Sequence, residues 1–153
     1  MAKDRINNNK VYSSVNLKHC LPISIEGVRV DVRIADKRFT LACIYRTPGV
    51  SNIDNSEFIS AIGKTFEGDS EPIIFDDFNY PEIDWSQLAT SRCSTAAEGF
   101  LLGHAHCYQM VKTNTRQRGD SLSLLDLLLV RDDKLVTEIQ TLPPLVKVTT
   151  WFC

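Results

Sequence analysis

Hydrophobic and polar positions alternate strictly over residues 28–34, which read V-R-V-D-V-R-I. A period of two is typical of a β-strand that buries one face. After a polar turn at 35–38, a second apolar run covers residues 39–45. The two runs and the turn between them predict a β-hairpin.

Helical spacing appears in two places. Apolar side chains recur every three or four positions over residues 58–66, after the capping residues of 54–56, which predicts an amphipathic helix that ends at 68–69. A second helix is predicted to begin at Thr95, because T-A-A-E at 95–98 fits the capping box. Gly99 weakens that helix slightly.

Other apolar runs predict strands at residues 73–75, 109–111 and 124–130, with a further short strand at 136–139. The run at 124–130 is expected to be buried on both faces. Asp126 lies inside it. A buried carboxylate is costly unless a histidine, an arginine or several hydrogen-bond donors are its neighbours, so Asp126 needs such a partner.

The composition fits one globular domain. A chain of 153 residues with 43% hydrophobic residues is long enough for a single core. Residues 1–20 have little apolar content and are expected to form a poorly ordered lead-in. The 17 basic and 19 acidic residues give a net charge of −2, which argues against binding of nucleic acid by bulk charge but leaves room for a local basic groove.

The five cysteines form no C-x-x-C pair, and no signal-peptide segment follows Met1, which indicates reduced thiols in an intracellular protein. His104, His106 and Cys107 lack a second ligand cluster at structural-zinc spacing, so zinc is not expected. The longest apolar stretch, 124–130, contains a carboxylate and is far too short to cross a bilayer. We therefore expect no membrane partner.

Candidate catalytic residues follow the 73–75 run, where the sequence continues D-D-F-N. Asp77 and Asn79 are two residues apart, and side chains at that spacing along a strand point the same way. The carboxylate can then hold water or a metal while the amide holds a phosphate oxygen. A simple turn is the alternative, because aspartate and asparagine are common turn formers.

Five segments occur in a characteristic order: A-C-I-Y-R-T-P-G at 42–49, I-I-F-D-D-F-N-Y-P-E-I-D-W at 73–85, Q-M-V-K-T-N-T-R at 109–116, S-L-L-D-L-L-L-V at 123–130 and L-P-P-L at 142–145. Together they resemble the later part of an endonuclease/exonuclease/phosphatase domain, the deoxyribonuclease-I-like endonuclease of jockey-like non-LTR retrotransposons. The segments span about two thirds of the chain, and we assign residues 21–145 to a partial domain of this kind.

This resemblance implies an α/β fold, a partial four-layer α/β/β/α sandwich with mostly antiparallel sheets flanked by helices. It implies hydrolysis of phosphodiester bonds in DNA with Mg²⁺ or Mn²⁺ and with no small-molecule cofactor. In the parent retrotransposon the reaction nicks target DNA to prime reverse transcription, which makes the nucleus a candidate location.

The resemblance also implies roles for individual residues. Asp77 matches the aspartate that activates the attacking water, and Asn79 matches the asparagine that orients the scissile phosphate. Tyr45 matches a tyrosine near that phosphate. These residue types suit the chemistry, because a carboxylate can accept a proton from water and neutral donors can stabilise the phosphate.

Three further positions match supporting parts of the site. Asp126 matches the aspartate that orients a catalytic histidine, and Thr115 and Ser123 match phosphate-side or supporting groups. Each residue also has a structural interpretation. Thr115 and Ser123 can cap turns, and Tyr45 can be a core aromatic at a strand end.

The chain departs from the family motifs in ways that predict a truncated, inactive domain. Residues 1–20 contain no counterpart of the family's earlier strands with their asparagine and metal-binding glutamate, so the metal ligands stay unassigned. The glycine of the family's G-D-F-N motif is Asp76 here, and a side chain at that position is expected to cost ~1–3 kcal/mol.

The family continues from L-P-P-L into G-K-S-D-H, whose aspartate and histidine complete the site, whereas residues 146–153 form a tail that matches no family motif. The tail back-translates as G-GTA-AAA-GTG-ACC-ACG-TGG-TTC-TGC, and the same bases read one position earlier encode G-K-S-D-H-V-V-L. We hypothesise a one-base deletion near codon 145. Genomic codons unrelated to GGTAAAAGTGACCAC would contradict this frameshift.

A non-catalytic interaction module is the alternative function. The surface around Tyr45 and Trp85 would then bind nucleic acid or protein. Salt-sensitive DNA binding without cleavage would favour this alternative.

Overall fold

The computed structural model describes residues 11–16, 21–22, 25–91, 94–104 and 106–140. The elements follow in this order: β1 (Val11–Asn16), β2 (Ile25–Ile34), β3 (Lys37–Arg46), α1 (Asn52–Glu67), β4 (Glu71–Asp77), β5 (Ile83–Asp84), β6 (Ala89–Thr90), α2 (Thr95–Gly103), β7 (Tyr108–Gln109), β8 (Arg116–Arg118), β9 (Ser121–Ser123), β10 (Asp126–Val130) and the 3-10 helix η2 (Asp133–Leu135).

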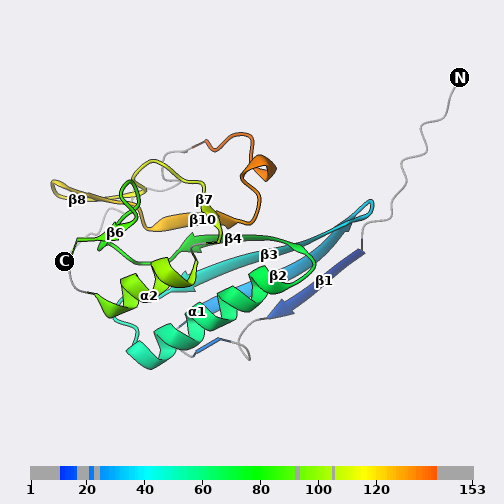
Figure 1. Cartoon of the computed structure of the whole chain (residues 1–153), viewed down its shortest axis with the longest axis horizontal. Helices are drawn as coiled ribbons and strands as arrows, with labels where there is room; N and C mark the ends of the chain where they lie inside the picture. The colour runs from blue at the N-terminus through cyan, green and yellow to red at the C-terminus, as the bar shows by residue number, and fades with distance from the viewer. Residues whose placement is uncertain (1–10, 17–20, 23–24, 92–93, 105, 141–153) are drawn as a thin grey trace, which may run out of the picture.

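A six-stranded sheet in the order β1-β2-β3-β4-β10-β7 forms the centre of the fold (Figure 1). Neighbouring strands are antiparallel except β3 and β4, which are parallel. The predicted hairpin is confirmed, since β2 and β3 pair from Ile25 opposite Arg46 to Ile34 opposite Lys37. The mixed α/β architecture with mainly antiparallel pairing confirms the predicted fold class.

Both α-helices lie along one face of this sheet (Figure 1). Thr40, Ala42 and Ile44 alternate along β3 with less buried neighbours and are themselves buried beneath the helices. Phe58 of α1 and Phe100 of α2 are fully buried, with their ring centroids 6.3 Å apart. Burial of such side chains stabilises the fold by ~1.5–3 kcal/mol each, so this layer is the core.

The opposite face of the sheet is apolar and open in the described part of the chain. Val28, Tyr45 and Phe75 are 46%, 38% and 41% exposed. Val28 and Phe75 both lie opposite Cys43, on the strands at either side of β3. A sheet with one apolar face uncovered matches one half of a sandwich, in which a second sheet would cover that face.

The elements differ from the sequence predictions in several places. Residues 11–16, expected to belong to the lead-in, form β1 and pair with β2 from Val11 opposite Arg33 to Asn16 opposite Val28. Helix α1 begins earlier than predicted, because the Ser51 side chain caps it by accepting from the Asp54 N–H. Helix α2 is capped by Ser94 rather than by Thr95.

Two expectations for the C-terminal part also change. Strand β10 begins at Asp126, whose side chain is exposed, so this carboxylate does not carry the burial cost that the sequence suggested. Residues 136–139 follow η2 without forming a strand. The hypothesised frameshift and the tail at 146–153 lie outside the described residues, as do residues 1–10 of the lead-in. No helix among the described residues is long and apolar enough to cross a membrane.

Two glycines of α2 provide a matched prediction about helix packing. A Cβ at Gly99 would lie 3.5 Å from Cδ1 of Ile59 in α1, which is ordinary contact, whereas a Cβ at Gly103 would lie 2.7 Å from Cγ2 of Ile59. Gly99→Ala should raise the free energy of unfolding by ~0.5–1 kcal/mol, because alanine favours the helix. Gly103→Ala should lower it by ~1 kcal/mol, because the stiff Ile59 side chain must move. Urea unfolding of both variants checks this, and equal shifts would contradict the packing described.

Candidate active site

Three strand ends bring the predicted site residues to one edge of the sheet. Asp77 is the last residue of β4, Asp126 is the first of β10, and the two lie directly opposite each other in the antiparallel pairing. Tyr45 lies near the end of β3, two residues beyond Cys43, which pairs with Phe75 of β4. Because β3 and β4 are parallel, Tyr45 and Asp77 reach the same edge.

The Asp77 carboxyl is electrostatically perturbed. Burial raises its pKa, and the charges of Asp126 and Asp76 raise it further. A hydrogen bond from the Asn79 backbone N–H to Asp77 Oδ1, at 3.0 Å, and the charge of Arg116 oppose this rise without cancelling it. A carboxylate with a raised pKa is a better proton acceptor near neutral pH than an ordinary aspartate.

The Asn79 side chain points inward, unlike that of Asp77. Asn79 lies beyond the end of β4 with φ 48°, is 8% exposed, and donates from Nδ2 to the Arg46 carbonyl at 2.7 Å. The expectation that Asp77 and Asn79 point the same way assumed that the strand continues to residue 79. The left-handed residue ends that alternation, so one amide N–H of Asn79 is already engaged.

Thr115 holds the start of β10. Its hydroxyl accepts from the backbone N–H groups of Leu125 at 3.1 Å and Asp126 at 3.0 Å, and its own N–H donates to the Ser123 carbonyl at 3.0 Å. These bonds connect the β8–β9 hairpin to the strand that carries Asp126. The structure therefore gives Thr115 a local structural role beside the candidate site.

No histidine contacts Asp126 among the residues that the structure describes. His104 and His106 both contact the ring of Phe66 in the helix layer. His104 is buried, its Nδ1 lies 2.8 Å from the Phe100 carbonyl, and burial lowers its pKa to about 4. The described histidines are therefore core and helix-layer residues.

Asp76 carries backbone strain, as we predicted because it replaces the glycine of the family's G-D-F-N motif. Its φ is 131°, a conformation that side-chain-bearing residues rarely adopt. Its Oδ2 accepts from the Cys43 thiol at 2.9 Å. Burial, followed by this hydrogen bond and the Asp76 charge, raises the pKa of Cys43 to about 11.

Divalent-metal ligation is incomplete in the described part of the chain. Asp77 and Asp126 supply carboxylate oxygens, the donors that Mg²⁺ and Mn²⁺ prefer. No group of three or more His, Cys, Asp or Glu side chains among the described residues is placed to hold a metal ion. These residues alone therefore do not form a metal site.

Three buried residues that hold the turn at 77–80 were not predicted from the sequence. Arg46, Asn55 and Tyr80 are buried and hydrogen-bonded around it. The only sequence signal was Asn55 at helical spacing before Phe58 and Ile62, which places an amide on the buried face of α1.

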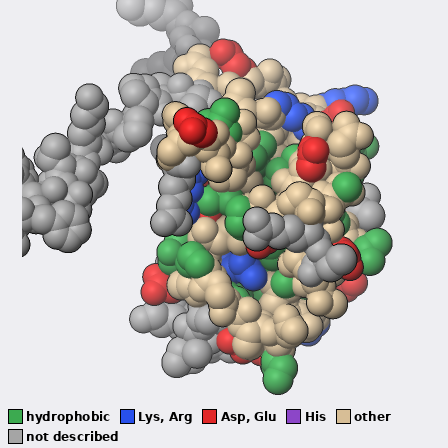
Figure 2. Space-filling view, turned by 90° about the vertical axis from the view of Figure 1, so that its left-hand side faces the viewer, with side chains coloured by type: hydrophobic (Ala, Val, Ile, Leu, Met, Phe, Trp, Pro, Cys, Tyr) green, Lys and Arg blue, Asp and Glu red, His purple; other side chains and the backbone are tan. Residues whose placement is uncertain are grey.

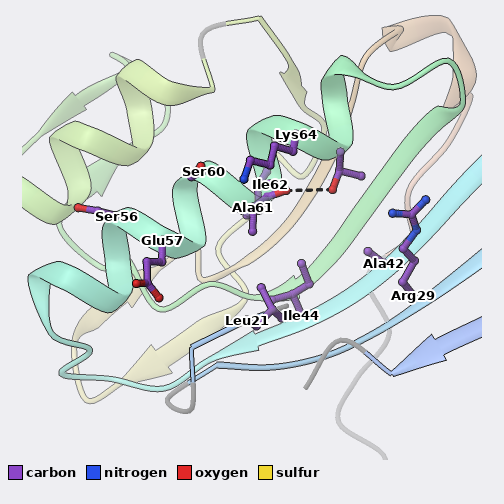
Figure 3. A pocket seen from close by; sticks show the side chains of 11 residues that line it. Leu21, Arg29, Ala42, Ile44, Ser56, Glu57, Ser60, Ala61, Ile62 and Lys64 are labelled. Atoms are coloured by element: carbon purple, nitrogen blue, oxygen red, sulfur yellow. Dashed lines mark hydrogen bonds between the residues drawn. The ribbon is translucent and has the colours of Figure 1, made fainter. Parts of the chain in front are cut away.

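A cavity between α1 and the sheet lies apart from the candidate site. This cavity of about 720 Å³ lies on the helix-covered side of the sheet, lined by residues of α1 and by Ala42 and Ile44 of β3 (Figure 3). It contains none of the predicted site residues. Figure 2, which faces the end of the molecule where β3 ends and α1 begins, shows acidic, basic and hydrophobic side chains interspersed without a continuous basic patch.

Comparisons with solved structures support the fold. An endonuclease/exonuclease/phosphatase family protein from Leptotrichia buccalis C-1013-b superposes with a TM-score of 0.55 and 15% identity, over 80% of this chain and 49% of that one. The endonuclease domain of TRAS1, a telomere-specific non-LTR retrotransposon, superposes with a TM-score of 0.55 and 14% identity, over 85% of this chain and 58% of that one. The chain thus spans about half the length of these structures.

Comparisons of sequence are more specific. No curated protein matches the chain. A family profile described as endonuclease-reverse transcriptase matches residues 39–146, a segment that runs from β3 past η2 and contains every predicted site residue. The chain belongs to the endonuclease-reverse transcriptase family.

Proposed function

We propose that this domain derives from a metal-dependent DNA phosphodiesterase of the kind that nicks target DNA to prime reverse transcription. The observation that carries the proposal is the pairing of Asp77 with Asp126 at the sheet edge, where the pKa of Asp77 is raised. A raised pKa beside a second carboxylate supports a proton-accepting role for Asp77. The family membership of residues 39–146 supports the same class of chemistry.

We assign the roles from the family resemblance, and the positions of Asp77, Asp126 and Tyr45 at one end of the strands support them. Asp77 accepts the proton of the attacking water; burial raises its pKa, and the charge of Asp126 opposite it adds to the rise. Tyr45, on the open face at the same edge, donates to a phosphate oxygen. Asn79 points inward and donates one amide N–H to the Arg46 carbonyl, so its role at the phosphate rests on the resemblance alone. Arg116, which is exposed and acts on Asp77 through its charge, attracts the DNA backbone.

We further propose that the 153-residue chain does not cleave DNA by itself. The described residues do not form a metal site, and no described histidine contacts Asp126. Without the charge neutralisation that a divalent ion supplies, the transition state of phosphodiester hydrolysis is poorly stabilised. The site would then need groups from another part of the sandwich.

A plasmid assay tests the chain as it stands. Supercoiled plasmid incubated with the chain and Mg²⁺ or Mn²⁺ should stay supercoiled to the same extent as with Asp77→Ala. Nicking that Asp77→Ala abolishes would contradict the proposed inactivity while supporting the site. Nicking that Asp77→Ala leaves unchanged would contradict the assignment of Asp77.

A non-catalytic interaction module remains the second candidate, and the open face of the sheet favours it. Val28, Tyr45 and Phe75 expose apolar surface of the kind that partner proteins cover. Trp85 does not belong to this surface, because it is half-buried and its ring packs edge-on against Phe100 at 6.3 Å. Binding of DNA without cleavage, lost as salt is raised, would favour this candidate in its nucleic-acid form.

A further inference from the structure

Arg46, the last residue of β3, is buried without a carboxylate partner in the described part of the chain. It is 5% exposed, and the ion pairs of the described residues join Arg29 to Asp31 and Arg38 to Asp69 instead. Burying a guanidinium is costly, and an apolar side chain of similar volume would usually serve packing at least as well. The position of its hydrogen bonds therefore indicates what Arg46 does.

The Arg46 guanidinium binds the backbone of the turn that carries the candidate site. Nη1 donates to the Asn79 carbonyl at 2.9 Å and to the Phe78 carbonyl at 3.4 Å. The backbone carbonyl of Arg46 accepts in return from Asn79 Nδ2 at 2.7 Å. The guanidinium carbon also lies 4.1 Å from the centre of the Tyr80 ring. Three consecutive residues of the turn are thus held by one arginine.

Asn55 of α1 completes this arrangement. It is 2% exposed, and its Oδ1 accepts from Arg46 Nε at 3.2 Å and from the Tyr80 hydroxyl at 2.5 Å. Its Nδ2 donates to the Ala96 carbonyl in α2 at 3.3 Å. The turn is therefore fixed to β3, α1 and α2 through side chains that satisfy one another, as a buried polar network requires.

We propose that Arg46, Asn55 and Tyr80 are positioning residues that set the turn at 77–80, so that Asp77 faces outward with the Asn79 backbone N–H on its carboxylate. The effect on catalysis rests on the proposed function. The hydrogen bonds that hold the turn do not depend on it. Two residues here have positive φ, namely Asp76 just before the turn at 131° and Asn79 within it at 48°. Such conformations persist only where the surroundings over-determine them.

Lysine cannot replace Arg46 in this arrangement. The planar guanidinium presents several fixed donors, which reach two carbonyls and the Asn55 amide oxygen while its carbon lies over the Tyr80 ring. An ammonium carries the same charge but reaches these acceptors with a different geometry. Arg46→Lys therefore keeps the positive charge and most of the side-chain bulk but removes the hydrogen-bond geometry that holds the turn.

Amide hydrogen exchange and carboxyl titration of the full chain test the inference. In Arg46→Lys, the Asn79 amide should exchange at least about tenfold faster than in the wild type, relative to amides in the middle of the sheet. The pKa of Asp77, followed by its carboxyl carbon resonance, should rise, because the hydrogen bond from the Asn79 N–H that lowers it is lost. Tyr80→Phe, which removes one bond of the network, should show both effects more weakly.

Phe66→Leu is the matched control, since Phe66 is buried in the same helix layer but contacts His104 and His106 rather than the turn. Phe66→Leu should raise the amide exchange rates uniformly across the fold and leave the pKa of Asp77 unchanged. If Arg46→Lys behaves like Phe66→Leu, Arg46 is only a packing residue and the inference fails. If Arg46→Lys does not fold, Tyr80→Phe alone decides by the same two measurements.

Activity separates this inference from the proposed function. If the domain, once complete, nicks DNA, Arg46→Lys should lower kcat, because the turn that carries Asp77 and Asn79 is no longer held in place. If the complete domain does not nick DNA, the proposed function fails, and exchange and titration still decide whether Arg46 positions the turn.

Discussion

Lowering the pH from 7 to 4 should reduce the free energy of unfolding by about 3 kcal/mol through His104 alone. Burial lowers the pKa of His104 from 6.5 to about 4. Between these values the unfolded chain binds a proton that the folded chain does not, so stability is complete above pH 6.5 and falls as the pH drops towards 4. Below pH 4 both states are protonated and this contribution stays constant.

The effect is isolated by comparing the wild type with His104→Leu. The ring of His104 lies 4.3 Å from that of Phe100, and its Nε2 is buried without a hydrogen-bond partner among the described residues, so leucine fits the apolar site. Urea unfolding at several pH values should show that the free energy of unfolding falls with acid in the wild type and in His106→Gln. The fall should be shallower in His104→Leu. Parallel pH profiles for all three proteins would show that His104 is not buried as described.

Asp76→Gly should stabilise the protein by about 1 kcal/mol, despite the loss of a hydrogen bond from Cys43. A residue at φ 131° carries a strain of ~1–3 kcal/mol, which glycine relieves. Glycine costs ~0.4–1 kcal/mol through the entropy of the unfolded chain, so a net gain remains. The melting temperature should rise by roughly 3 °C in a domain of this size.

Asp76→Ala is the control for this prediction, because it removes the carboxylate but keeps the Cβ in the strained conformation. It should not stabilise the protein. Both variants should lower the pKa of Cys43 from about 11, since the Asp76 hydrogen bond and charge contribute to raising it. Faster reaction of Cys43 with a thiol reagent near pH 8 reports that change. If Asp76→Gly destabilises the protein as much as Asp76→Ala does, Asp76 is not strained as described.

Local sequence patterns predicted the elements whose residues both favour that secondary structure and show a regular apolar pattern. The strict alternation at 28–34 gave β2, because each apolar side chain lies on the open face and each polar one on the other. Strand β1 was missed, since the apolar residues of V-Y-S-S-V-N do not alternate with polar ones and its strand conformation depends on backbone bonds to β2. The start of α1 was missed because Asn52 and Ile53 are exposed and show no apolar period.

The candidate site was predictable in its residues but not in their orientation. Motif order placed Asp77, Asn79, Asp126 and Tyr45, and the structure brings Asp77 opposite Asp126. Sequence spacing could not show that Asn79 turns inward, because its φ of 48° depends on the partners of the turn. Arg46 was missed for a related reason. A charged residue at a strand end is usually solvated, and only the packing of α1 and the turn makes it buried.

The central claim is that Asp77 serves a phosphodiesterase site completed by another part of the sandwich. The most direct measurement supplies that part as a separate chain, taken from a related retrotransposon endonuclease domain, and follows relaxation of supercoiled plasmid with Mg²⁺ or Mn²⁺. We expect nicking by the mixture and by neither chain alone, reduced at least ~100-fold by Asp77→Ala. Nicking by the mixture that Asp77→Ala does not reduce, or no nicking although the two chains bind each other, would contradict the claim.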